Sequence, residues 1–299
     1  MEKIDILLAT YNGSKYLPEQ LNSILSQSYK NINVIIRDDG SSDNTVDIIK
    51  EYEQEDNRVR LLNDNLGNLG FVRNFEELMK HSDAEYIMFS DQDDVWYKNK
   101  VEISYLEIKK IEGEYGCKVP TLVHTNSRIL NFEVKTTKKF ISNYAKNYSF
   151  ENSFFNFFVQ GSTMIINKYL KEESLPFSEY VYLHDRYLHL VAEFIGIRRY
   201  IDIPTMDYRQ HLNNEIGSKS ESIFKRLYSG RYYNNSDKLL FINIYETYEK
   251  RLKKNKIKKL KIFFKIIDTN ISRFLRLYWC LKEDVPMSLR KKIFLLLKG

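Results

Sequence analysis

The first 90 residues repeat one local pattern: a short apolar run, a polar loop, and then apolar residues at helical spacing. The apolar runs are residues 4–9, 33–37, 59–62 and 86–90. After the first run, Leu17, Leu21 and Ile24 recur every three or four positions, with Pro18 near the start, as in an amphipathic helix. Strands and helices that alternate at this pace are typical of an α/β fold with a mostly parallel sheet.

Polar clusters follow three of these predicted strands. The clusters are residues 10–12, 38–43 and 91–94. Because parallel sheets bind ligands beyond the carboxyl ends of their strands, we expect the three loops to share one ligand site. The residue pattern therefore predicts a ligand-binding α/β domain before any family is considered.

The cluster at 91–94 holds three carboxylates, Asp91, Asp93 and Asp94, within four residues. Carboxylates this close repel one another, and a divalent cation relieves that repulsion. Mg²⁺ or Mn²⁺ is commonly held by one or two carboxylates together with substrate phosphates. A solvated acidic turn that caps the next helix is the alternative. The spacing alone leaves both readings open, and Trp96 directly afterwards favours the metal site.

Asp38 and Asp39 also lie at a predicted strand end, ahead of a turn that contains Ser42 and Asp43. Ser42 or Asp43 would cap the helix that follows, so capping explains the second half of this segment. It leaves the two adjacent acids unexplained. A carboxylate here could accept a hydrogen bond from the ring N–H of a pyrimidine base. The alternative, that both acids serve only the turn and the helix cap, stays open.

Two further segments carry candidate chemistry. Asp185 precedes a predicted helix over 186–195, where it is either a helix cap or a general base that takes a proton from an attacking hydroxyl. Arg209 and His211 stand close together before a polar turn. Arg suits phosphate, and His suits a metal or a phosphate.

Composition narrows the class of protein. With 43% hydrophobic and 29% charged residues, the chain reads as globular rather than disordered. No uninterrupted apolar segment reaches the ~18 residues of a membrane span, and the N-terminal segment lacks signal-peptide features. Cys117 and Cys280 show neither metal-ligand nor redox spacing. We therefore expect a cytoplasmic protein with neither a disulfide framework nor a zinc site.

Charge divides the chain unevenly. Residues 250–299 carry a net charge of +13, against −7 for residues 1–249. We expect an α/β domain over 1–217 and a basic helical region over 218–299. Within 254–267 apolar residues recur at helical spacing among lysines, which predicts either a peripheral contact with an anionic membrane or a helix packed on the domain. No motif supports nucleic-acid binding, and a homodimer stays open.

Together these segments resemble the family 2 glycosyltransferases, whose α/β fold is called GT-A. The resemblance runs in order over about residues 1–215. The segments that carry it are ILLATYNGSKYLPEQLNSILSQ, VIIRDDGSSDNT, NLGNLGFVRN, FSDQDDVW, VQGSTMI, LHDRYLHLVAEFIG and YRQHLNN.

The resemblance implies roles for individual residues. Asp185 matches the catalytic base, and Asp93, Asp91 and His211 match the environment of the Mg²⁺ or Mn²⁺ ion. The nucleotide-sugar site would comprise Thr10, Tyr11, Asn12, Asp38, Asp39, Asn68, Gly70, Arg73, Asn74, Asp91, Gln92 and Arg209.

Within that family, the segment Asp-Gln-Asp-Asp-Val-Trp and the pair His184-Asp185 look like the bacterial rhamnosyltransferase-like branch. The resemblance implies an inverting transfer of L-rhamnose from dTDP-L-rhamnose onto a surface polysaccharide, with an acceptor that is often lipid-linked. A UDP-sugar donor is the alternative within the family. A glycoside hydrolase and a non-catalytic carbohydrate-binding module are the alternatives of other classes. The enzyme would lie in the cytoplasm or peripherally on the inner face of the cell membrane.

Overall fold

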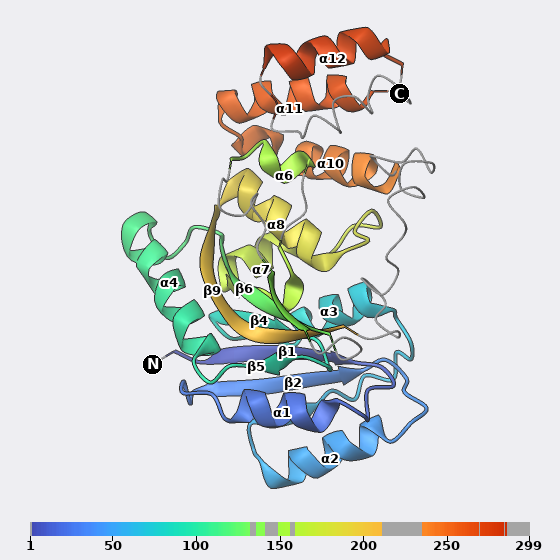
Figure 1. Ribbon diagram of the computed structural model, residues 1–299, viewed down its shortest axis with the longest axis vertical. Coiled ribbons are helices and arrows are strands. Elements are labelled where there is room, and N and C mark those ends of the chain that lie inside the picture. Colours follow the sequence, from blue (N-terminus) through green and yellow to red (C-terminus); the bar gives the residue numbers. More distant parts are fainter. Residues whose placement is uncertain are drawn as a thin grey trace.

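The predicted alternation of strands and helices is confirmed in the N-terminal part of the chain (Figure 1). The computed structural model describes residues 2–131, 136–140, 149–155, 159–210, 235–268, 270–283 and 285. Its first elements are β1 (Ile4–Thr10), α1 (Leu17–Leu25), β2 (Ile32–Asp38), α2 (Thr45–Glu55), β3 (Val59–Leu61), α3 (Phe71–Lys80) and β4 (Tyr86–Ser90). Strand β1 pairs in parallel with β2 and β4, and β2 with β3, so the polar loops gather at one edge.

The second half of the sheet is mixed rather than parallel. It contains β5 (Val95–Trp96), α4 (Lys100–Tyr115), β6 (Thr121–Asn131), β7 (Thr136–Phe140), α6 (Asn152–Phe155), η1 (Gly161–Thr163), β8 (Met164–Asn167), α7 (Lys168–Ser174), α8 (His184–Ile195) and β9 (Ile197–Gln210). The strand order is β3-β2-β1-β4-β8-β6-β9-β5, with β7 paired to β6. Strand β8 runs antiparallel to both neighbours, whereas β6 and β9 pair in parallel.

Both faces of the central strands are buried, which explains why these strands read as continuous apolar runs. Successive side chains of a strand point to opposite faces. Leu7 therefore joins a core with α3 and α8, while Ile6 and Leu8 join a second core with α1 and α4. Helices on both faces hold the polar loops at the sheet edge in fixed positions.

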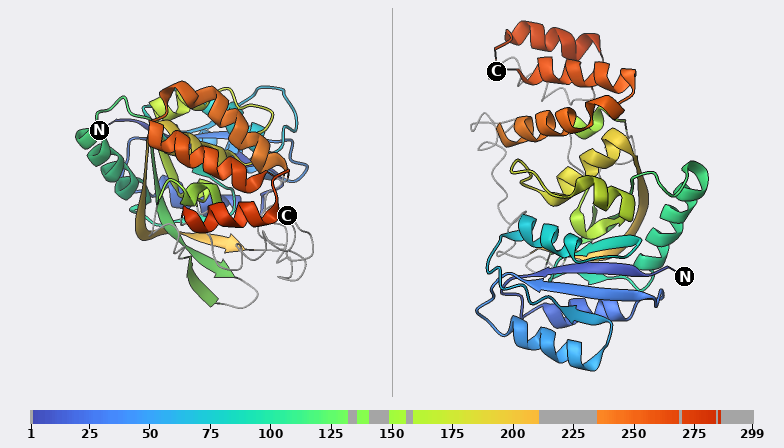
Figure 2. Two further views of the ribbon diagram at one scale, coloured as in Figure 1. Left: turned by 90° about the horizontal axis from the view of Figure 1, so that it is seen from above. Right: turned by 180° about the vertical axis from the view of Figure 1, so that it is seen from behind.

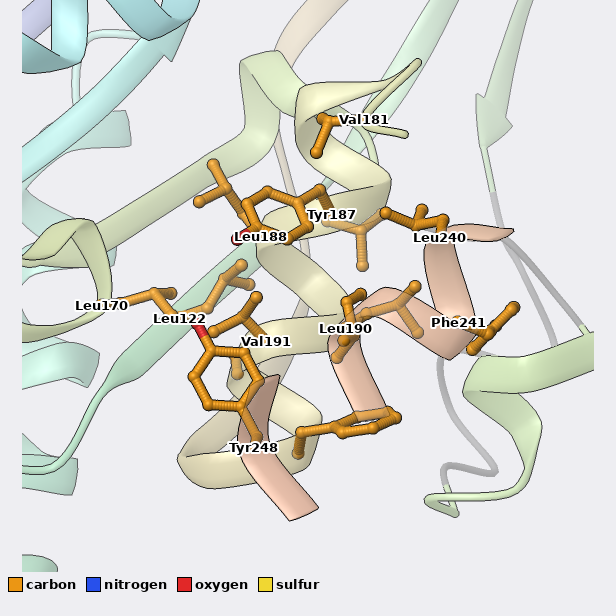
Figure 3. Packing of buried hydrophobic residues seen from close by; sticks show 14 of the residues in the cluster. Leu122, Leu170, Val181, Tyr187, Leu188, Leu190, Val191, Leu240, Phe241 and Tyr248 are labelled. Atoms are coloured by element: carbon orange, nitrogen blue, oxygen red, sulfur yellow. The ribbon is translucent and has the colours of Figure 1, made fainter. Parts of the chain in front are cut away.

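The C-terminal helices continue one of these cores. They are α10 (Asn235–Tyr248), the short η2 (Glu249–Arg251), α11 (Lys254–Ile267) and α12 (Arg273–Lys282). Leu240 and Phe241 of α10 pack against Leu188 and Leu190 of α8 in one cluster (Figure 3). In α11, Leu260 is fully buried in the same cluster. The apolar face of α11 therefore packs on the protein, as one of the two readings of the basic helix predicted.

The helices α10, α11 and α12 stack beyond α8, at the end of the molecule opposite β1–β3 (Figures 1 and 2). The predicted boundary at 217/218, and the predicted helical pattern over 218–234, lie outside the described residues and stay predictions. Within the described ranges, no helix is long and apolar enough to cross a membrane.

Candidate active site

The loop after β1 is tied directly to the loop after β2. Thr10 Oγ1 donates a hydrogen bond to Asp38 Oδ1 over 2.9 Å. Asn12 has a left-handed backbone, with φ 48°, and its amide N–H donates to Ser41 Oγ over 2.8 Å. Its side-chain oxygen accepts from the backbone N–H of Ser42. The predicted nucleotide-site residues Thr10, Asn12 and Asp38 therefore belong to one hydrogen-bonded network at the carboxyl ends of two parallel strands.

Asp39 anchors the next loop along the chain. Its carboxylate lies 2.8 Å from the guanidinium of Arg37, which is almost completely buried and also pairs with Asp64. The same carboxylate accepts hydrogen bonds from the backbone N–H groups of Leu69 and Gly70, over 2.7 and 2.8 Å. Asp39 therefore holds the start of α3 against β2, a role that the sequence did not distinguish from base recognition.

The predicted residues on and before α3 divide between two directions. Asn68 donates to the backbone carbonyl of Asp39, so it faces the loop after β2. The buried Asn74 donates to the carbonyl of Arg37. Arg73 points elsewhere: its guanidinium donates to the backbone carbonyls in the segment 177–178 and pairs with Glu76. Asn68 and Asn74 thus join the strand-end loops, whereas Arg73 braces the segment before α8.

Gln92 connects the acidic cluster to the first loop. Its side-chain oxygen accepts from the N–H of Tyr11, and its amide nitrogen donates to the Tyr11 carbonyl, both over 2.9 Å. A Cβ atom on Gly13 would lie 2.1 Å from the Gln92 oxygen, so a larger residue at 13 would displace the Gln92 side chain from this position. The central residue of the Asp-Gln-Asp segment therefore clamps the backbone of Tyr11, whose side chain is left exposed.

The acidic cluster itself is drawn into the protein. Asp91 is half-buried, Asp93 is 9% exposed and Asp94 is fully buried. Burial, followed by the charges of Asp91 and Asp93, raises the pKa of Asp94 well above its ordinary value. Asp94 Oδ2 has no hydrogen-bond partner among the described residues. This concentration of negative charge favours a cation and contradicts the reading as a solvated turn.

Asp185 lies in the first turn of α8, with Leu183 at the N-cap position. Its carboxylate accepts from the N–H of Gly161 over 3.2 Å and from the N–H of Arg186 over 2.7 Å. The side chain keeps some solvent contact, yet the surrounding protein desolvates it and raises its pKa to about 7. Asp185 is therefore held rigidly by two backbone donors while its proton affinity is matched to neutral pH.

His184 lies beside Asp185 in an aromatic pocket. Its ring centroid lies 4.2 Å from that of Phe75 and 5.5 Å from that of Phe89. Burial lowers the pKa of His184 to about 3, so the ring is neutral. A Cβ atom on Gly161 would lie 2.7 Å from His184 Nε2. Glycine at 161 thus lets the imidazole approach the backbone that donates to Asp185.

Tyr208 lies near enough to the acidic cluster and to Asp185 for the charges of both to act on it. The tyrosine is partly buried on β9, and burial is the main cause of its raised pKa. The carboxylate charges that raise this pKa further are those of Asp91, Asp94, Asp93 and Asp185. Tyr208 was not among the predicted site residues. Recognising β9 as a strand would have been the signal, because β9 carries this residue next to the predicted Arg209.

Arg209 braces the backbone of the acidic cluster. Its Nε donates to the carbonyl of Asp93 over 2.7 Å, and its backbone N–H donates to Asp94 over 3.3 Å. The guanidinium pairs with Glu19 over 2.6 Å and lies over the ring of Tyr16. Arg209 therefore fixes the geometry of the predicted metal site. Contact with a diphosphate stays a prediction.

Of the predicted metal ligands, Asp91 and Asp93 lie in this cluster, and His211 lies outside the described residues. In the part of the chain that the structure describes, no three His, Cys, Asp or Glu side chains are arranged to hold a metal ion by themselves. Mg²⁺ commonly takes only one or two protein carboxylates and completes its shell with water and substrate phosphates. The clustered carboxylates and the unpartnered Asp94 oxygen fit an ion held in that way.

The chain is similar to known glycosyltransferases. The family described as Glycosyl transferase family 2 matches residues 5–172. A dTDP-rhamnosyl transferase, RfbG of Shigella flexneri, is 32% identical over 241 residues, which are 74% of this chain and 78% of that protein. The glucosyltransferase WfaP of Escherichia coli, named as acting on α-D-GlcNAc-diphosphoundecaprenol with UDP-Glc, is 37% identical over 39% of this chain and 46% of its own length.

Solved structures show the same fold. TarS residues 1–349 of S. aureus, in complex with UDP-GlcNAc, match with a TM-score of 0.59 at 16% identity, covering 98% of this chain and 88% of that one. A mannosyltransferase of Pyrobaculum calidifontis, in complex with GDP-Man and Mn²⁺, matches with a TM-score of 0.54 at 13% identity, covering 99% and 85%. The chain therefore has the GT-A fold and belongs to glycosyltransferase family 2, as a nucleotide-sugar glycosyltransferase.

Proposed function

We propose that this enzyme transfers a sugar by a single displacement that inverts the anomeric carbon, with Asp185 as the general base. The observation that supports the proposal is the raised pKa of Asp185, about 7, in a site shared with the acidic cluster around Tyr208. A general base works best when its pKa lies near the operating pH. Asp185 would accept the proton of the acceptor hydroxyl while the bond to the anomeric carbon forms.

The nucleotide sugar would lie across the loops after β1, β2 and β4. The base would lie against the exposed Tyr11, on the loops that Asp38 and Asn12 tie together. Asp91 and Asp93 would hold Mg²⁺ or Mn²⁺ against the diphosphate, where the ion supplies Lewis-acid stabilisation of the leaving group. Arg209 would keep the acidic backbone in place during the reaction.

For the donor we propose dTDP-L-rhamnose, because the rhamnosyl transferase relative aligns over about three quarters of both chains. A UDP-sugar is the second candidate, since the relative that uses UDP-Glc is 37% identical over a shorter segment. The name of that relative also includes a lipid-linked acceptor. We propose a lipid-linked glycan of a bacterial surface polysaccharide as the acceptor here, with the enzyme at the cytoplasmic face of the membrane.

Thermal unfolding with a panel of donors tests the proposal. The panel is dTDP-rhamnose, UDP-glucose, UDP-galactose, UDP-N-acetylglucosamine and GDP-mannose, each with Mg²⁺, with Mn²⁺ and with EDTA. A donor at 100 times its Kd stabilises the fold by ~2.7 kcal/mol. We expect the largest Tm shift with dTDP-rhamnose and a metal ion. A larger shift with a UDP-sugar would contradict the donor assignment, and the absence of any metal-dependent shift would contradict the site.

A further inference from the structure

One face of α11 carries a row of lysines. Lys254, Lys258, Lys261 and Lys265 are all exposed and are separated by four, three and four residues. Residues three and four apart lie on the same side of a helix, so these side chains form one line. The opposite side is the one that Phe263 buries in the core. Packing of α11 on the protein therefore leaves its cationic face directed outward.

The neighbouring helix α12 leaves a large apolar face exposed. Phe274 is 81% exposed, Leu281 59%, Tyr278 49% and Leu275 46%. The buried residues of the same helix are Arg276 and Cys280, and the partly buried Trp279 also packs against the core. Four large apolar side chains exposed on a ten-residue helix are more than scattered surface residues would give and mark an interaction site.

The lysine row and the apolar face adjoin. The ammonium group of Lys265 lies 4.5 Å from the ring centroid of Trp279, and that of Lys282 lies 5.3 Å from the same ring. Helices α11 and α12 lie side by side at the end of the molecule farthest from β1–β3 (Figures 1 and 2). The basic–aromatic tip comprises Lys254, Lys258, Lys261, Lys265, Lys282, Phe274, Leu275, Tyr278, Trp279 and Leu281.

The charge of the tip has a single sign. Neither the sequence of α11 nor that of α12 contains an aspartate or glutamate. Repulsion within such a surface is relieved by an anionic partner, and each Lys near an anionic bilayer contributes about fivefold in affinity. Lysine chains reach the headgroup region, while Trp, Tyr and Phe prefer the boundary between headgroups and acyl chains. A purely electrostatic partner would leave the apolar face of α12 in water.

We propose that the basic–aromatic tip docks the enzyme on an anionic lipid bilayer, with the lysine row over the headgroups and Phe274, Tyr278 and Leu281 in the interface. The inference rests on the proposed function, because docking on a bilayer would bring the enzyme to its proposed lipid-linked acceptor. It moves the membrane contact from the apolar face of α11, which the fold buries, to the exposed face of α12.

Co-sedimentation of the full chain with vesicles tests the docking without any sugar transfer. Vesicles of phosphatidylcholine with 30% phosphatidylglycerol are compared with phosphatidylcholine alone. Replacing all four lysines of the row by Gln is expected to weaken binding to the anionic vesicles at least about 100-fold. The matched control replaces four exposed lysines elsewhere by Gln and is expected to bind within about threefold of the unmodified chain. The control lysines are Lys30, Lys50, Lys110 and Lys118.

Two further measurements test insertion of α12. The double variant Phe274→Ser and Leu281→Ser keeps every charge and is expected to lose at least about tenfold in binding, since burial of these side chains drives insertion. Brominated lipids should quench the fluorescence of Trp279, because the other tryptophan, Trp96, is buried. The proposal would be overturned if the four Lys→Gln substitutions left vesicle binding unchanged. It would also be overturned if the double variant bound as tightly as the unmodified chain and the fluorescence of Trp279 were not quenched. Donor-induced Tm shifts in the same preparations report separately on the catalytic proposal.

Discussion

Two pairs of adjacent aspartates at strand ends look alike in the sequence and have opposite surroundings in the fold. Asp38 and Asp39 are satisfied by the protein: Asp39 pairs with the buried Arg37, and both accept backbone N–H groups. Asp93 and Asp94 are buried in the loop after β4, where burial and the charges of Asp91 and Asp93 raise the pKa of Asp94. The first pair is held by the scaffold, whereas the second includes Asp94, a buried carboxylate with one oxygen that lacks a hydrogen-bond partner among the described residues.

Asp185 belongs with the second pair, although it comes from a helix N-terminus far away in the sequence. Its two backbone hydrogen bonds fix its position, and desolvation still raises its pKa to about 7. The comparison teaches that the proposed site contains the carboxylates whose pKa the fold raises, in keeping with the clustering of perturbed pKa values at active sites.

The largest expected effect comes from Asp185→Asn. The substitution keeps the size of the side chain and one of its two hydrogen bonds from the backbone, and it removes the proton acceptor, so turnover should fall by ~10²- to 10⁴-fold. Donor binding, measured as the Tm shift with metal ion present, should be retained. Asp83→Asn, at an exposed position, serves as the control. Near-normal turnover by Asp185→Asn would remove this residue from the role of base.

The next prediction compares how the two aspartate pairs contribute to the free energy of unfolding. Asp39→Asn leaves the buried Arg37 with less compensating charge and should lower the free energy of unfolding by ~3 kcal/mol. Asp94→Asn removes a carboxylate that burial opposes and should leave the stability of the metal-free protein unchanged or higher. Urea unfolding of both variants measures the difference. Equal losses in the two variants would show that the pairs are equivalent after all.

The last effect is a dependence of stability on pH. The folded protein raises the pKa of Asp185 from 3.8 to about 7, so the folded state binds this proton more tightly than the unfolded state. Its contribution is fully present below pH ~4 and is lost as the pH rises through 7, with a slope of at most ~1.4 kcal/mol per pH unit. The difference in free energy of unfolding between the metal-free unmodified protein and Asp185→Asn, measured by urea unfolding, should therefore grow from pH ~4 to pH ~7. A constant difference would contradict the raised pKa.

The first half of the fold could be predicted because its signals are local. Strands β1 to β4 are continuous apolar runs, and the helices after them repeat apolar residues every three or four positions. Strand β9 gave no such signal. It contains Pro204, and its pairing with β6 shifts register near Thr125. Its position depends on β6, which lies more than 70 residues earlier, so a local pattern could not reveal it.

In the candidate site, too, local signals could be predicted from the sequence and long-range contacts could not. Strand-end loops identified Thr10, Asp38 and the acidic cluster, because the carboxyl ends of parallel strands meet at one edge. Tyr208 was missed, and the scaffold role of Asp39 was not separable from recognition. Both depend on which distant side chains surround a residue, and sequence spacing does not encode those neighbours.

By itself the sequence determined the α/β class, the family, the strand-end acids and a C-terminal region rich in lysine. Periodicity, residue type and net charge are properties of neighbouring residues and are read without coordinates. Only the tertiary structure decided which carboxylates are satisfied and which are not, and which face of the basic helices meets solvent. Burial and hydrogen bonding set the pKa of Asp185 and the exposure of α12, and both arise from contacts between segments far apart in the chain.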